Sequence, residues 1–468
     1  MEHKSCQLLI LGGGPGGYSC ALQAADLGLD VVLVEPEDLG GTCLHAGCIP
    51  SKAIIHVAQH YHQSTADPHM RDIGLQTQGV SLDWPRAQQW KDALIARLAK
   101  GVQGLLQTAQ VQVVKGYGEL QDGKRCWVRS SPAGEVEVEY TTEHLVISVG
   151  AQEIEIPGFS PSADVLYAES ALELPQLPKS MLVVGAGYIG VELGQAFARL
   201  GVQVTIAESA ANILPLWDAE LTRPLHKQLA AEGISLRLQS KAIEFIDGRV
   251  VLETDTGERE TLSCEKVLVA VGRKPRLTGW GLRNVPLDLL DGRLQVNAQC
   301  RTSMSGVYAI GDVTGGPMLA HRAIAQGRIV AERIVSKRHQ FDPAAIPAVC
   351  FSQPEIVSVG LTPSEAKEQF PPDEVMVSRL PFAGNGRALT LGDGVGFVRV
   401  VVQREGQVVL GVQAVGRQVA ELAHGFTVAL EMGACLEDIA LMALAHPTLG
   451  ESFAEAAHAA MGVASLGD

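Results

Sequence analysis

Two cysteines stand close together near the start of the chain. Cys43 and Cys48 are five residues apart in GTCLHAGCIPSK, residues 41–52. A regular helix turns by about 100° per residue, so it would point these two side chains in different directions. A distorted first helical turn after Gly40 and Gly41 would bring the sulfur atoms within disulfide range. The pair is then either a redox disulfide or two buried structural cysteines.

A histidine and a carboxylate stand together near the other end, in AHPTLGE. His446 precedes Pro447, whose ring restricts the backbone, and Glu451 follows five residues after the histidine. A carboxylate that accepts a hydrogen bond from one imidazole nitrogen orients the ring and stabilises its protonated form. The other nitrogen is then free to take a proton. Considered alone, a His-Pro pair is more often a structural turn.

An internal duplication supplies the elements that must position these groups. Residues 7–35, QLLILGGGPGGYSCALQAADLGLDVVLVE, and residues 180–208, SMLVVGAGYIGVELGQAFARLGVQVTIAE, follow one plan at an offset of 173 residues. Each copy has an apolar run of strand length, a G-x-G-x-x-G turn, a helical segment and a second apolar strand that ends in an acid. The glycines are Gly12, Gly14, Gly17 and Gly185, Gly187, Gly190, and the acids are Glu35 and Glu208.

This unit has a specific physical purpose. The first glycine allows a tight turn, the second lets the backbone approach a pyrophosphate, and the third lets the helix pack closely on the strand. The helix N-terminus offers free N–H groups to the phosphates. The acid can accept hydrogen bonds from a ribose diol. One such turn is weak evidence, but two copies in register predict two bound dinucleotides.

The rest of the chain indicates how the domains are arranged. A buried-type strand and a glycine turn end each unit, in LVISVGAQEIEIPG at residues 145–158 and VLVAVGRK at residues 267–274. A strand, a Gly-Asp turn and a helix follow at residues 306–334, and this strand should rejoin the first sheet. From Pro343 onward, alternating apolar residues predict antiparallel strands, followed by Ala-rich helices. We expect an α/β protein with two Rossmann-like domains and a C-terminal α+β domain.

Composition and charge restrict the possible roles of the chain. The 468 residues carry 37 Lys and Arg against 52 Asp and Glu, a formal net charge of −15, which disfavours nucleic-acid binding. No run reaches the ~20 apolar residues of a spanning helix, so we expect no membrane insertion. The nine cysteines are an odd number and the N-terminus has no apolar signal segment, which predicts a cytoplasmic protein. His56 and His60 lack a third ligand, so we predict no metal site.

Taken in order, these motifs resemble the pyridine nucleotide–disulfide oxidoreductases, specifically the dihydrolipoamide dehydrogenases. The first dinucleotide unit, GGTCLHAGCIPSK, the second unit, AIGDV with GPMLAHRA, and HPTLGE occur in the family's order and cover essentially the whole chain. The resemblance implies FAD in the first unit and NAD in the second. It implies domains at residues 1–150 (FAD and redox disulfide), 151–274 (NAD), 275–345 (completing the FAD domain) and 346–468 (dimerisation).

The resemblance also implies a reaction and its residues. Protein-bound dihydrolipoamide would be oxidised by NAD+, with Cys43 exchanging with the dithiol and Cys48 passing electrons to the flavin. A base from the other subunit of a homodimer would take the thiol proton. The residues assigned to this chemistry are Cys43, Cys48, Lys52, Glu192, His446 and Glu451.

The cofactor contacts implied by the resemblance lie in both units. Those expected around FAD are Gly12, Gly14, Gly17, Glu35, Gly41, Thr42, Lys52, Gly116, Ser148, Gly150, Asp312, Met318, Leu319 and Ala320. Those expected around NAD are Gly185, Gly187, Gly190, Glu208, Ala242 and Gly272. The sequence departs from the usual family pattern at His45, where Asn is common, and at Leu444, where many relatives have a histidine. Neither departure removes a catalytic group.

Related functions and partners remain to be weighed. A glutathione reductase would read a 2′-phosphate with arginines, but Glu208 is followed by Ser-Ala-Ala, which favours NAD. A mercuric reductase would carry a C-terminal cysteine pair, whereas the last cysteine is Cys435. A structural docking subunit is a different class of alternative, which the complete set of redox motifs disfavours. The resemblance implies a component of 2-oxoacid dehydrogenase or glycine cleavage complexes, and partners in the lipoyl and peripheral-subunit-binding domains of an acyltransferase.

Overall fold

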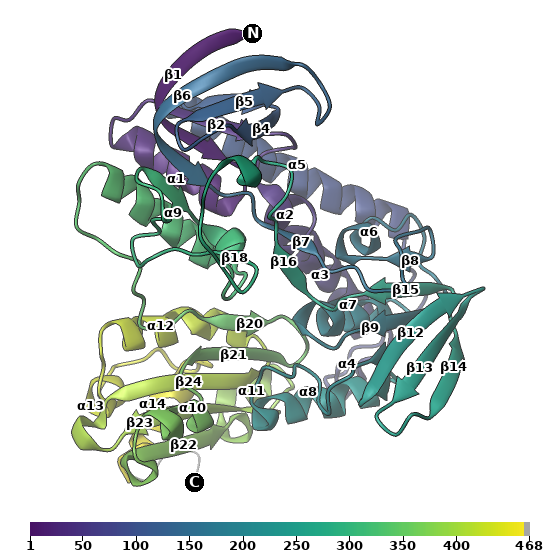
Figure 1. The fold of residues 1–468 in the computed structure, drawn as a ribbon. Coiled ribbons are helices and arrows are strands. Elements are labelled where there is room, and N and C mark those ends of the chain that lie inside the picture. Colours follow the sequence, from purple (N-terminus) through teal and green to yellow (C-terminus); the bar gives the residue numbers. More distant parts are fainter. Residues whose placement is uncertain (463–468) are drawn as a thin grey trace.

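The first dinucleotide unit lies in a seven-stranded sheet at the top of Figure 1. The computed structural model describes residues 1–462. The sheet has the order β3-β2-β1-β6-β5-β4, and β19 also pairs with β6. Its strands are β1 (Glu2–Leu11), β2 (Val31–Glu35), β3 (Gln112–Lys115), β4 (Tyr117–Leu120), β5 (Arg125–Arg129), β6 (Val136–Ile147) and β19 (Val307–Ala309). A strand from far along the chain therefore extends the N-terminal sheet.

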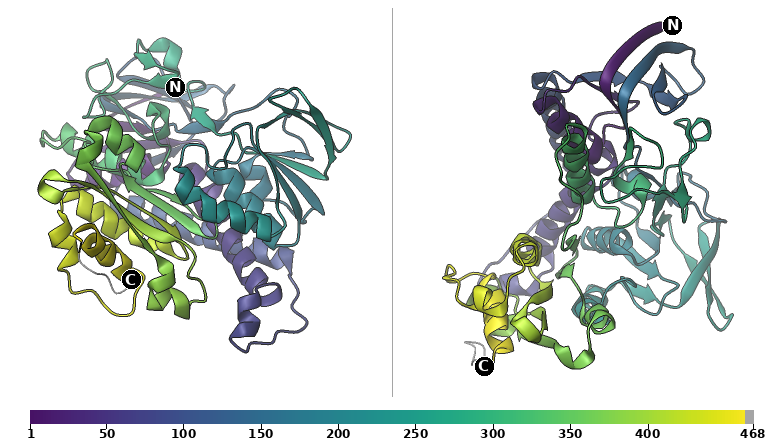
Figure 2. Two further views of the ribbon diagram at one scale, coloured as in Figure 1. Left: turned by 90° about the horizontal axis from the view of Figure 1, so that it is seen from below. Right: turned by 60° about the vertical axis from the view of Figure 1, so that its left-hand side comes forward.

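Two helices of this part pack tightly against each other because glycines let them approach. α1 (Pro15–Asp26) and α9 (Ala320–Ile334) lie side by side in Figure 1. A Cβ at Gly327 would lie only 2.5 Å from the carbonyl oxygen of Gly16. The other helices of this part are α2 (Gly41–His45), α3 (Cys48–Thr65), α4 (Pro68–Asp72) and α5 (Trp84–Thr108). The segment that carries α4, coloured purple, projects as an arm in the left view of Figure 2.

The second dinucleotide unit forms a five-stranded parallel sheet of order β11-β10-β9-β15-β8. Its strands are β8 (Val165–Leu166), β9 (Ser180–Val184), β10 (Gln203–Ala207), β11 (Ser235–Arg237) and β15 (Lys266–Val269). Its helices are α6 (Ala168–Leu172), α7 (Tyr188–Arg199) and α8 (Ala219–Ala231). A separate antiparallel sheet, β12 (Ser240–Ile246), β13 (Arg249–Thr254) and β14 (Arg259–Ser263), lies beside it at the right of Figure 1. Two short antiparallel strands, β7 (Ala151–Glu153) and β16 (Arg273–Pro275), connect the two units.

The C-terminal part is a five-stranded antiparallel sheet with helices packed against it. The sheet order is β20-β21-β24-β23-β22. Its strands are β20 (Ala348–Cys350), β21 (Glu355–Gly360), β22 (Val375–Pro381), β23 (Phe397–Gln403) and β24 (Val409–Gly416). Its helices are α10 (Pro363–Gln369), α11 (Gly386–Thr390), α12 (Ala423–Glu431), α13 (Leu436–Ala440) and α14 (Glu451–Ala460). Residues 463–468, the end of the predicted C-terminal domain, lie outside the described residues.

Short elements complete the fold. They are the hairpin β17 (Leu289–Leu290) and β18 (Arg293–Leu294) and the 3-10 turns η1 (Leu282–Asn284), η2 (Gly311–Thr314), η3 (Pro372–Glu374), η4 (Phe382–Gly384), η5 (Glu405–Gln407) and η6 (Val419–Leu422). The expected class, two Rossmann-like domains with a C-terminal α+β domain, is confirmed. None of the helices within residues 1–462 combines the length and apolar character needed to cross a membrane.

A buried arginine joins the second unit to the C-terminal domain. Arg399 of β23 is 2% exposed, and its guanidinium contacts Glu220 at 2.9 Å and Asp218 at 3.3 Å at the start of α8. Its Nε also donates to the side-chain oxygen of Gln413 at 2.9 Å. A buried charge is tolerated only when it is paired, so these contacts fix the position of α8 against the sheet.

Candidate active site

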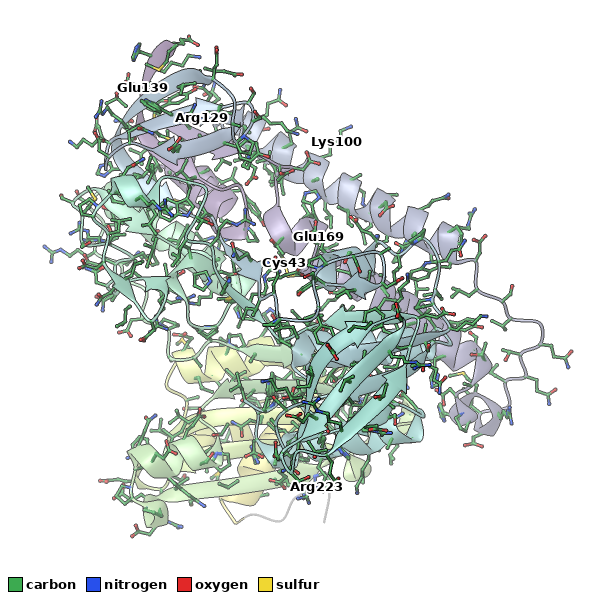
Figure 3. All side chains as sticks on the ribbon, turned by 45° about the vertical axis from the view of Figure 1, so that its right-hand side comes forward. Cys43, Lys100, Arg129, Glu139, Glu169 and Arg223 are labelled. Carbon is green, nitrogen blue, oxygen red and sulfur yellow. A yellow bond between two sulfur atoms is a disulfide. The ribbon has the colours of Figure 1, made fainter. Side chains whose placement is uncertain are left out.

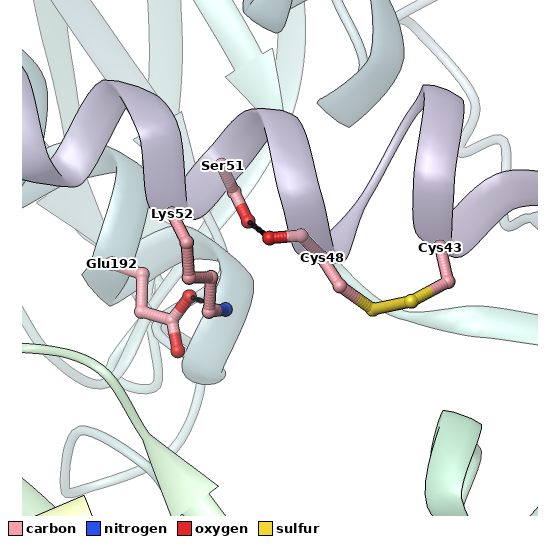
Figure 4. The surroundings of a disulfide bond; sticks show 5 residues. All are labelled: Cys43, Cys48, Ser51, Lys52 and Glu192. Atoms are coloured by element: carbon pink, nitrogen blue, oxygen red, sulfur yellow. Dashed lines mark hydrogen bonds and ion pairs between the residues drawn. A yellow bond between two sulfur atoms is a disulfide. The ribbon is translucent and has the colours of Figure 1, made fainter. Parts of the chain in front are cut away.

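The redox cysteines lie at a break between two helices. Cys43 is in the five-residue helix α2, and Cys48 is the first residue of α3. The chain leaves helical geometry at Ala46 and Gly47 (φ −146°, ψ −105°). This break brings the two Cα atoms to 4.6 Å, and the sulfur atoms form a disulfide (Figure 4). Figure 3 shows Cys43 inside the outline of the molecule, whereas Lys100 and Arg223 project from its surface.

The helix that begins at Cys48 carries an ion pair one turn later. The Lys52 ammonium lies 2.8 Å from the Glu192 carboxylate of α7, as Figure 4 shows. Glu192 is 3% exposed, and its second oxygen accepts a hydrogen bond from the backbone amide of Phe351 at 2.8 Å. The Phe351 ring lies 4.5 Å from the same ammonium, a cation–π distance. One ion pair thus joins the disulfide helix, the second dinucleotide unit and the C-terminal domain.

The first glycine turn has the close contacts that only glycine allows. A Cβ at Gly17 would collide with the carbonyl of Gly12, and a Cβ at Gly12 with the carbonyl of Ser148. Gly14 is the N-cap of α1 and a Cβ there would meet only Gly41, at 3.9 Å. The first and third glycines are therefore required by packing, whereas the second leaves open space at the helix N-terminus. That space is suited to a pyrophosphate.

The second turn repeats this geometry. A Cβ at Gly190 would collide with the carbonyl of Gly185, and a Cβ at Gly185 would lie 2.7 Å from the carbonyl of Ala270. A Cβ at Gly187, the N-cap of α7, would meet nothing within 4 Å. Both turns therefore leave the middle position clear, as two dinucleotides require. The residues present fit the predicted cofactors at both sites.

Both acids are held rigidly beside their turns. The Glu35 carboxylate accepts hydrogen bonds from the backbone amides of Gly13 at 2.5 Å and Glu37 at 2.9 Å. The Glu208 carboxylate accepts from those of Ala186 at 2.7 Å and Ala210 at 2.8 Å. Each carboxylate has lone pairs beyond those used here, so it can also accept hydrogen bonds from a ribose diol.

The remaining residues predicted to contact the cofactors lie in turns, short helices and strands of the two units. Gly116 donates its amide to the carbonyl of Glu35, Ser148 donates its amide to the carbonyl of Leu11, and a Cβ at Gly41 would lie 2.7 Å from Gly14. Gly150 and Gly272 have positive φ values of 73° and 114°. Thr42 lies in α2, Asp312 in η2, and Ala242 in β12. Met318 and Leu319 lead into α9, which starts at Ala320.

Asp312, which is predicted to contact FAD, is more buried than an ordinary surface carboxylate. Its pKa is raised because burial disfavours the charged form, while Arg273 and Arg322 act in the opposite direction. Arg322 is fixed by hydrogen bonds to the carbonyl of Gly315 at 2.5 Å and the hydroxyl of Thr314 at 3.0 Å. The two arginines leave a positively charged surrounding around this turn, which suits a phosphate.

The predicted base lies apart from the cysteines within one chain. His446 Nδ1 is 2.8 Å from Glu451 Oε1, and Glu451 Oε2 accepts the amide of Thr448 at 2.6 Å. The pKa of Glu451 is lowered by the Thr448 amide first and by His446. The His446 side chain is 79% exposed. The structure therefore brings Cys43 and Cys48 to the Lys52–Glu192 pair and leaves His446 at the surface of the C-terminal domain.

The other unusual residues have structural partners. His45, between the cysteines, hydrogen-bonds through Nε2 to the carbonyl of Leu39 at 2.9 Å. The His56 ring stacks on Trp90 and meets His60 edge to face, and burial lowers its pKa. Leu444 is 38% exposed. Within residues 1–462, no cluster of three or more His, Cys, Asp or Glu could hold a metal ion.

Sequence reasoning missed the segment that closes this site from the C-terminal domain. The amide of Phe351 binds Glu192, and Gln195 exchanges two hydrogen bonds with the backbone of Gln353, at 2.7 and 2.8 Å. Glu355 lines the same cavity as Lys52 and Glu192. The signal available in the sequence was a carboxylate placed at the start of an apolar strand, in QPEIVSV.

Two family descriptions match the chain. Residues 6–327 match "Pyridine nucleotide-disulphide oxidoreductase", and residues 346–457 match the dimerisation domain of that family. The dihydrolipoyl dehydrogenase of Pseudomonas aeruginosa is 48% identical over 97% of both chains. That of Geobacillus stearothermophilus is 39% identical over 97% of this chain and 96% of its own.

Solved structures agree with these similarities. LpdA from Mycobacterium tuberculosis superimposes with a TM-score of 0.88 at 27% identity, over 98% of this chain and 99% of its own. The flavoprotein disulfide reductase RclA from Escherichia coli does so with a TM-score of 0.85 at 26% identity, over 97% of this chain and 99% of its own. The predicted family and the two predicted cofactors are thus confirmed. The chain belongs to the pyridine nucleotide–disulphide oxidoreductases, and within them to the dihydrolipoyl dehydrogenases, enzymes that use FAD and NAD.

Proposed function

We propose that the chain oxidises protein-bound dihydrolipoamide to lipoamide and reduces NAD+, through the Cys43–Cys48 disulfide. The observation that carries this proposal is the continuous path from that disulfide along α3 to the Lys52–Glu192 pair, which joins the two dinucleotide units. The test is direct. Purified protein should be yellow from bound flavin and should form NADH from dihydrolipoamide. A colourless protein, or one that cannot form NADH from this dithiol, would contradict the proposal.

The first step is thiol–disulfide exchange. A substrate thiolate attacks the sulfur of Cys43, which forms a mixed disulfide and releases Cys48 as a thiolate. The second substrate thiolate then attacks the mixed disulfide, so lipoamide leaves and Cys43 and Cys48 keep the electron pair. Cys48 begins α3, where unpaired N–H groups and the helix dipole stabilise a negative sulfur.

A base must take the substrate proton before the attack, because the thiolate is the nucleophile. His446 fits this role, since Glu451 and the Thr448 amide fix its ring and leave Nε2 for the incoming proton. The negative Glu451 then stabilises the imidazolium. Replacing Cys48 by serine should abolish the thiolate–flavin charge-transfer absorbance while flavin stays bound.

FAD held by the first unit would supply the acceptor for the dithiol's electron pair, and NAD+ held by the second unit would be the final hydride acceptor. The chain's own contribution is to bind and orient. The turn around Gly14 would hold the FAD pyrophosphate and Glu35 its ribose. The turn around Gly187 and Glu208 would do the same for NAD. Lys52 keeps a positive charge where electrons accumulate.

We also infer that one active site is built from two subunits. The dimerisation domain supports a homodimer, and exposed His446 could then serve the cysteines of the partner. Mixing tests this. A heterodimer of one Cys48→Ser subunit and one His446→Gln subunit contains one unmutated active site and one with both mutations, so it should regain activity. Heterodimers that form and stay as inactive as both parent dimers would refute the shared site.

The expected partners are the lipoyl and peripheral-subunit-binding domains of an acyltransferase in the cytoplasm. The net charge of −15 favours a basic partner surface. Affinity capture with the tagged chain should recover an acyltransferase subunit, and its identity would show whether a 2-oxoacid complex is served. Recovery of glycine cleavage components instead would assign the chain to that complex.

A further inference from the structure

A cavity lies behind the Lys52–Glu192 pair, between α3, α7 and the segment that enters β21. Its volume is about 160 Å³, enough for several water molecules. Its charged lining residues are Lys52, Glu192, Arg199 and Glu355, and His56 also lines it. Nothing in the proposed mechanism uses Glu355, so its role needs an explanation.

Glu355 differs from the other charged residues of the cavity. Lys52 is paired with Glu192, and Arg199 is paired with Glu232 through two hydrogen bonds in a buried contact. Both cations are therefore already neutralised. Within residues 1–462 Glu355 takes part in no ion pair, and its carboxylate accepts a backbone amide from Ala420 at 2.9 Å.

The surroundings of Glu355 favour its protonated form. Burial raises its pKa to about 7, against the hydrogen bond from the Ala420 amide, and the nearby carboxylates of Glu421 and Glu192 act in the same direction as burial. His56 does not compensate, because burial lowers its own pKa and keeps it neutral. The titratable residues on the two helices packed against β21 are His424 and Glu431 of α12 and Glu220, Arg223, His226 and Lys227 of α8. Glu220 is paired with Arg399, and Glu431 accepts the amide of Ala344. Arg417, which follows β24, donates to the carbonyl of Leu391.

Glu355 is also tied to the ion pair through the backbone. Phe351, whose amide binds Glu192, lies four residues before Glu355 in the same connecting segment. Gln195 of α7 fixes this segment from the other side by its two hydrogen bonds to Gln353. The Glu192 and Glu355 carboxylates thus line the same cavity, so they repel each other when both are charged.

We propose that the Glu355 carboxylate binds and releases a proton beside the Lys52–Glu192 pair, and that it binds this proton more tightly when the enzyme is reduced. The proposal rests on the proposed function, because it needs reduction of the disulfide and its flavin. The net reaction is dihydrolipoamide plus NAD+ to lipoamide, NADH and one proton. Glu355 does not change this balance: it binds a proton from the cavity water when two electrons arrive and returns it when hydride leaves.

The size of the effect follows from Coulomb's law. Reduction places about one new negative charge near α3, and a carboxylate roughly 10 Å from such a charge becomes harder to ionise by about one pH unit at an effective permittivity of about 20. Oxidised enzyme should therefore ionise Glu355 near pH 7, and reduced enzyme near pH 8. Between these values reduction should draw in protons.

The test is infrared difference spectroscopy of the dimeric, flavin-loaded protein between pH 5 and 9. A protonated carboxyl group should titrate with a midpoint near pH 7 in the oxidised enzyme, and the midpoint should rise by about one unit after reduction with dithionite. Glu355→Gln should remove this signal, since its amide still accepts from Ala420 but cannot titrate. Glu355→Asp should restore a titrating group. Glu421→Gln, an exposed neighbour, should keep the signal with a lower midpoint.

Three results would overturn the proposal: a wild-type protein without a titrating carboxyl signal in this range, a midpoint that does not rise when the protein is reduced, or the same signal in Glu355→Gln. The wild-type and Glu355→Asp spectra decide the matter even if Glu355→Gln does not fold. Infrared titration of the oxidised protein needs no dihydrolipoamide. A protein that shows the expected spectra but does not oxidise dihydrolipoamide would therefore refute the proposed substrate and leave the role of Glu355 standing.

Discussion

Replacing Glu451 by glutamine tests how the C-terminal domain prepares His446. The carboxylate receives two N–H donors, Nδ1 of His446 at 2.8 Å and the Thr448 amide at 2.6 Å. Glutamine has nearly the same size but only one oxygen, so it satisfies one donor and turns its own NH₂ group toward the other. Either the imidazole loses its orientation or the turn at Thr448 loses its hydrogen bond.

The expected loss can be worked out from that geometry. A hydrogen bond to a charged acceptor contributes about 1.5–3 kcal/mol, which corresponds to about a 10- to 150-fold fall in kcat/KM. Removing the base itself typically costs about 10²- to 10⁴-fold, so His446→Gln should lose more than Glu451→Gln. The fall should appear for dihydrolipoamide oxidation, which needs the proton transfer.

The assay compares two reactions of the same preparation. Steady-state kinetics with dihydrolipoamide and NAD+ report the base, whereas NADH oxidation by an artificial electron acceptor needs the flavin but not His446. Glu437→Gln, an exposed change on nearby α13, is the matched control and should behave as the parent in both. Unchanged dihydrolipoamide kinetics in Glu451→Gln, or an equal fall in both reactions, would refute the reasoning.

Four further predictions follow from the glycine turns, Glu208 and the thiols. Gly187→Ala should fold normally, because its Cβ has space in the protein, and should weaken NAD+ binding, because that space is the one expected for the pyrophosphate. Gly190→Ala should instead lower thermal stability, because its Cβ meets the Gly185 carbonyl. Calorimetry measures the change in stability, and NAD+ titration measures the change in binding. Glu208→Ala should lower kcat/KM for NAD+ by about 10- to 150-fold, which corresponds to the loss of one charge-assisted hydrogen bond to the ribose. Glu208→Arg should reduce the preference for NAD+ over NADP+. An unmutated protein that prefers NADP+ would contradict this assignment. Burial raises the pKa of Cys6 and Cys264 to about 11 and that of Cys20, Cys126, Cys300 and Cys350 to about 12. At pH 8 a thiol reagent should therefore modify Cys435 alone in the oxidised protein. After reduction it should also modify Cys43 and Cys48. Because the pKa values of these buried thiols are higher in the folded than in the unfolded chain, they contribute stability that is fully present below the thiol pKa of the unfolded chain, about 8.5. The free energy of unfolding, measured by denaturation at increasing pH, should therefore fall between about pH 8.5 and pH 12.

The glycine turns were the part of the fold most readily predicted from sequence. Steric contacts such as Gly17 against Gly12 are local, so the motif alone specifies strand, turn and helix. The two Rossmann-like domains followed from the duplication, and the C-terminal α+β domain followed from the alternating apolar residues after Pro343. The antiparallel sheet at residues 240–263 was not anticipated, although β12 alternates between inward and outward side chains over its first residues.

The active site was harder to predict, because its geometry depends on distant segments. A distorted helical turn was expected between the cysteines, but the chain forms two helices separated by a break at Gly47. The spacing of the cysteines excluded a regular helix without specifying which interruption replaces it. Glu355 could not be placed at all, since its cavity is formed by α3, α7 and the C-terminal domain, and no periodicity in the sequence encodes that contact.

The buried Arg399 has a consequence for how the nicotinamide coenzyme enters and leaves. Together with the Gln195–Gln353 bonds, it fastens the second dinucleotide unit to the C-terminal sheet at two separate places. Hinged domains that close over a ligand need an interface that can open at little cost, and opening this one would break both ion pairs of the buried Arg399 guanidinium. The coenzyme should therefore bind and dissociate through local rearrangement of side chains at its site. A rotation of the second dinucleotide unit away from the C-terminal domain should not limit turnover.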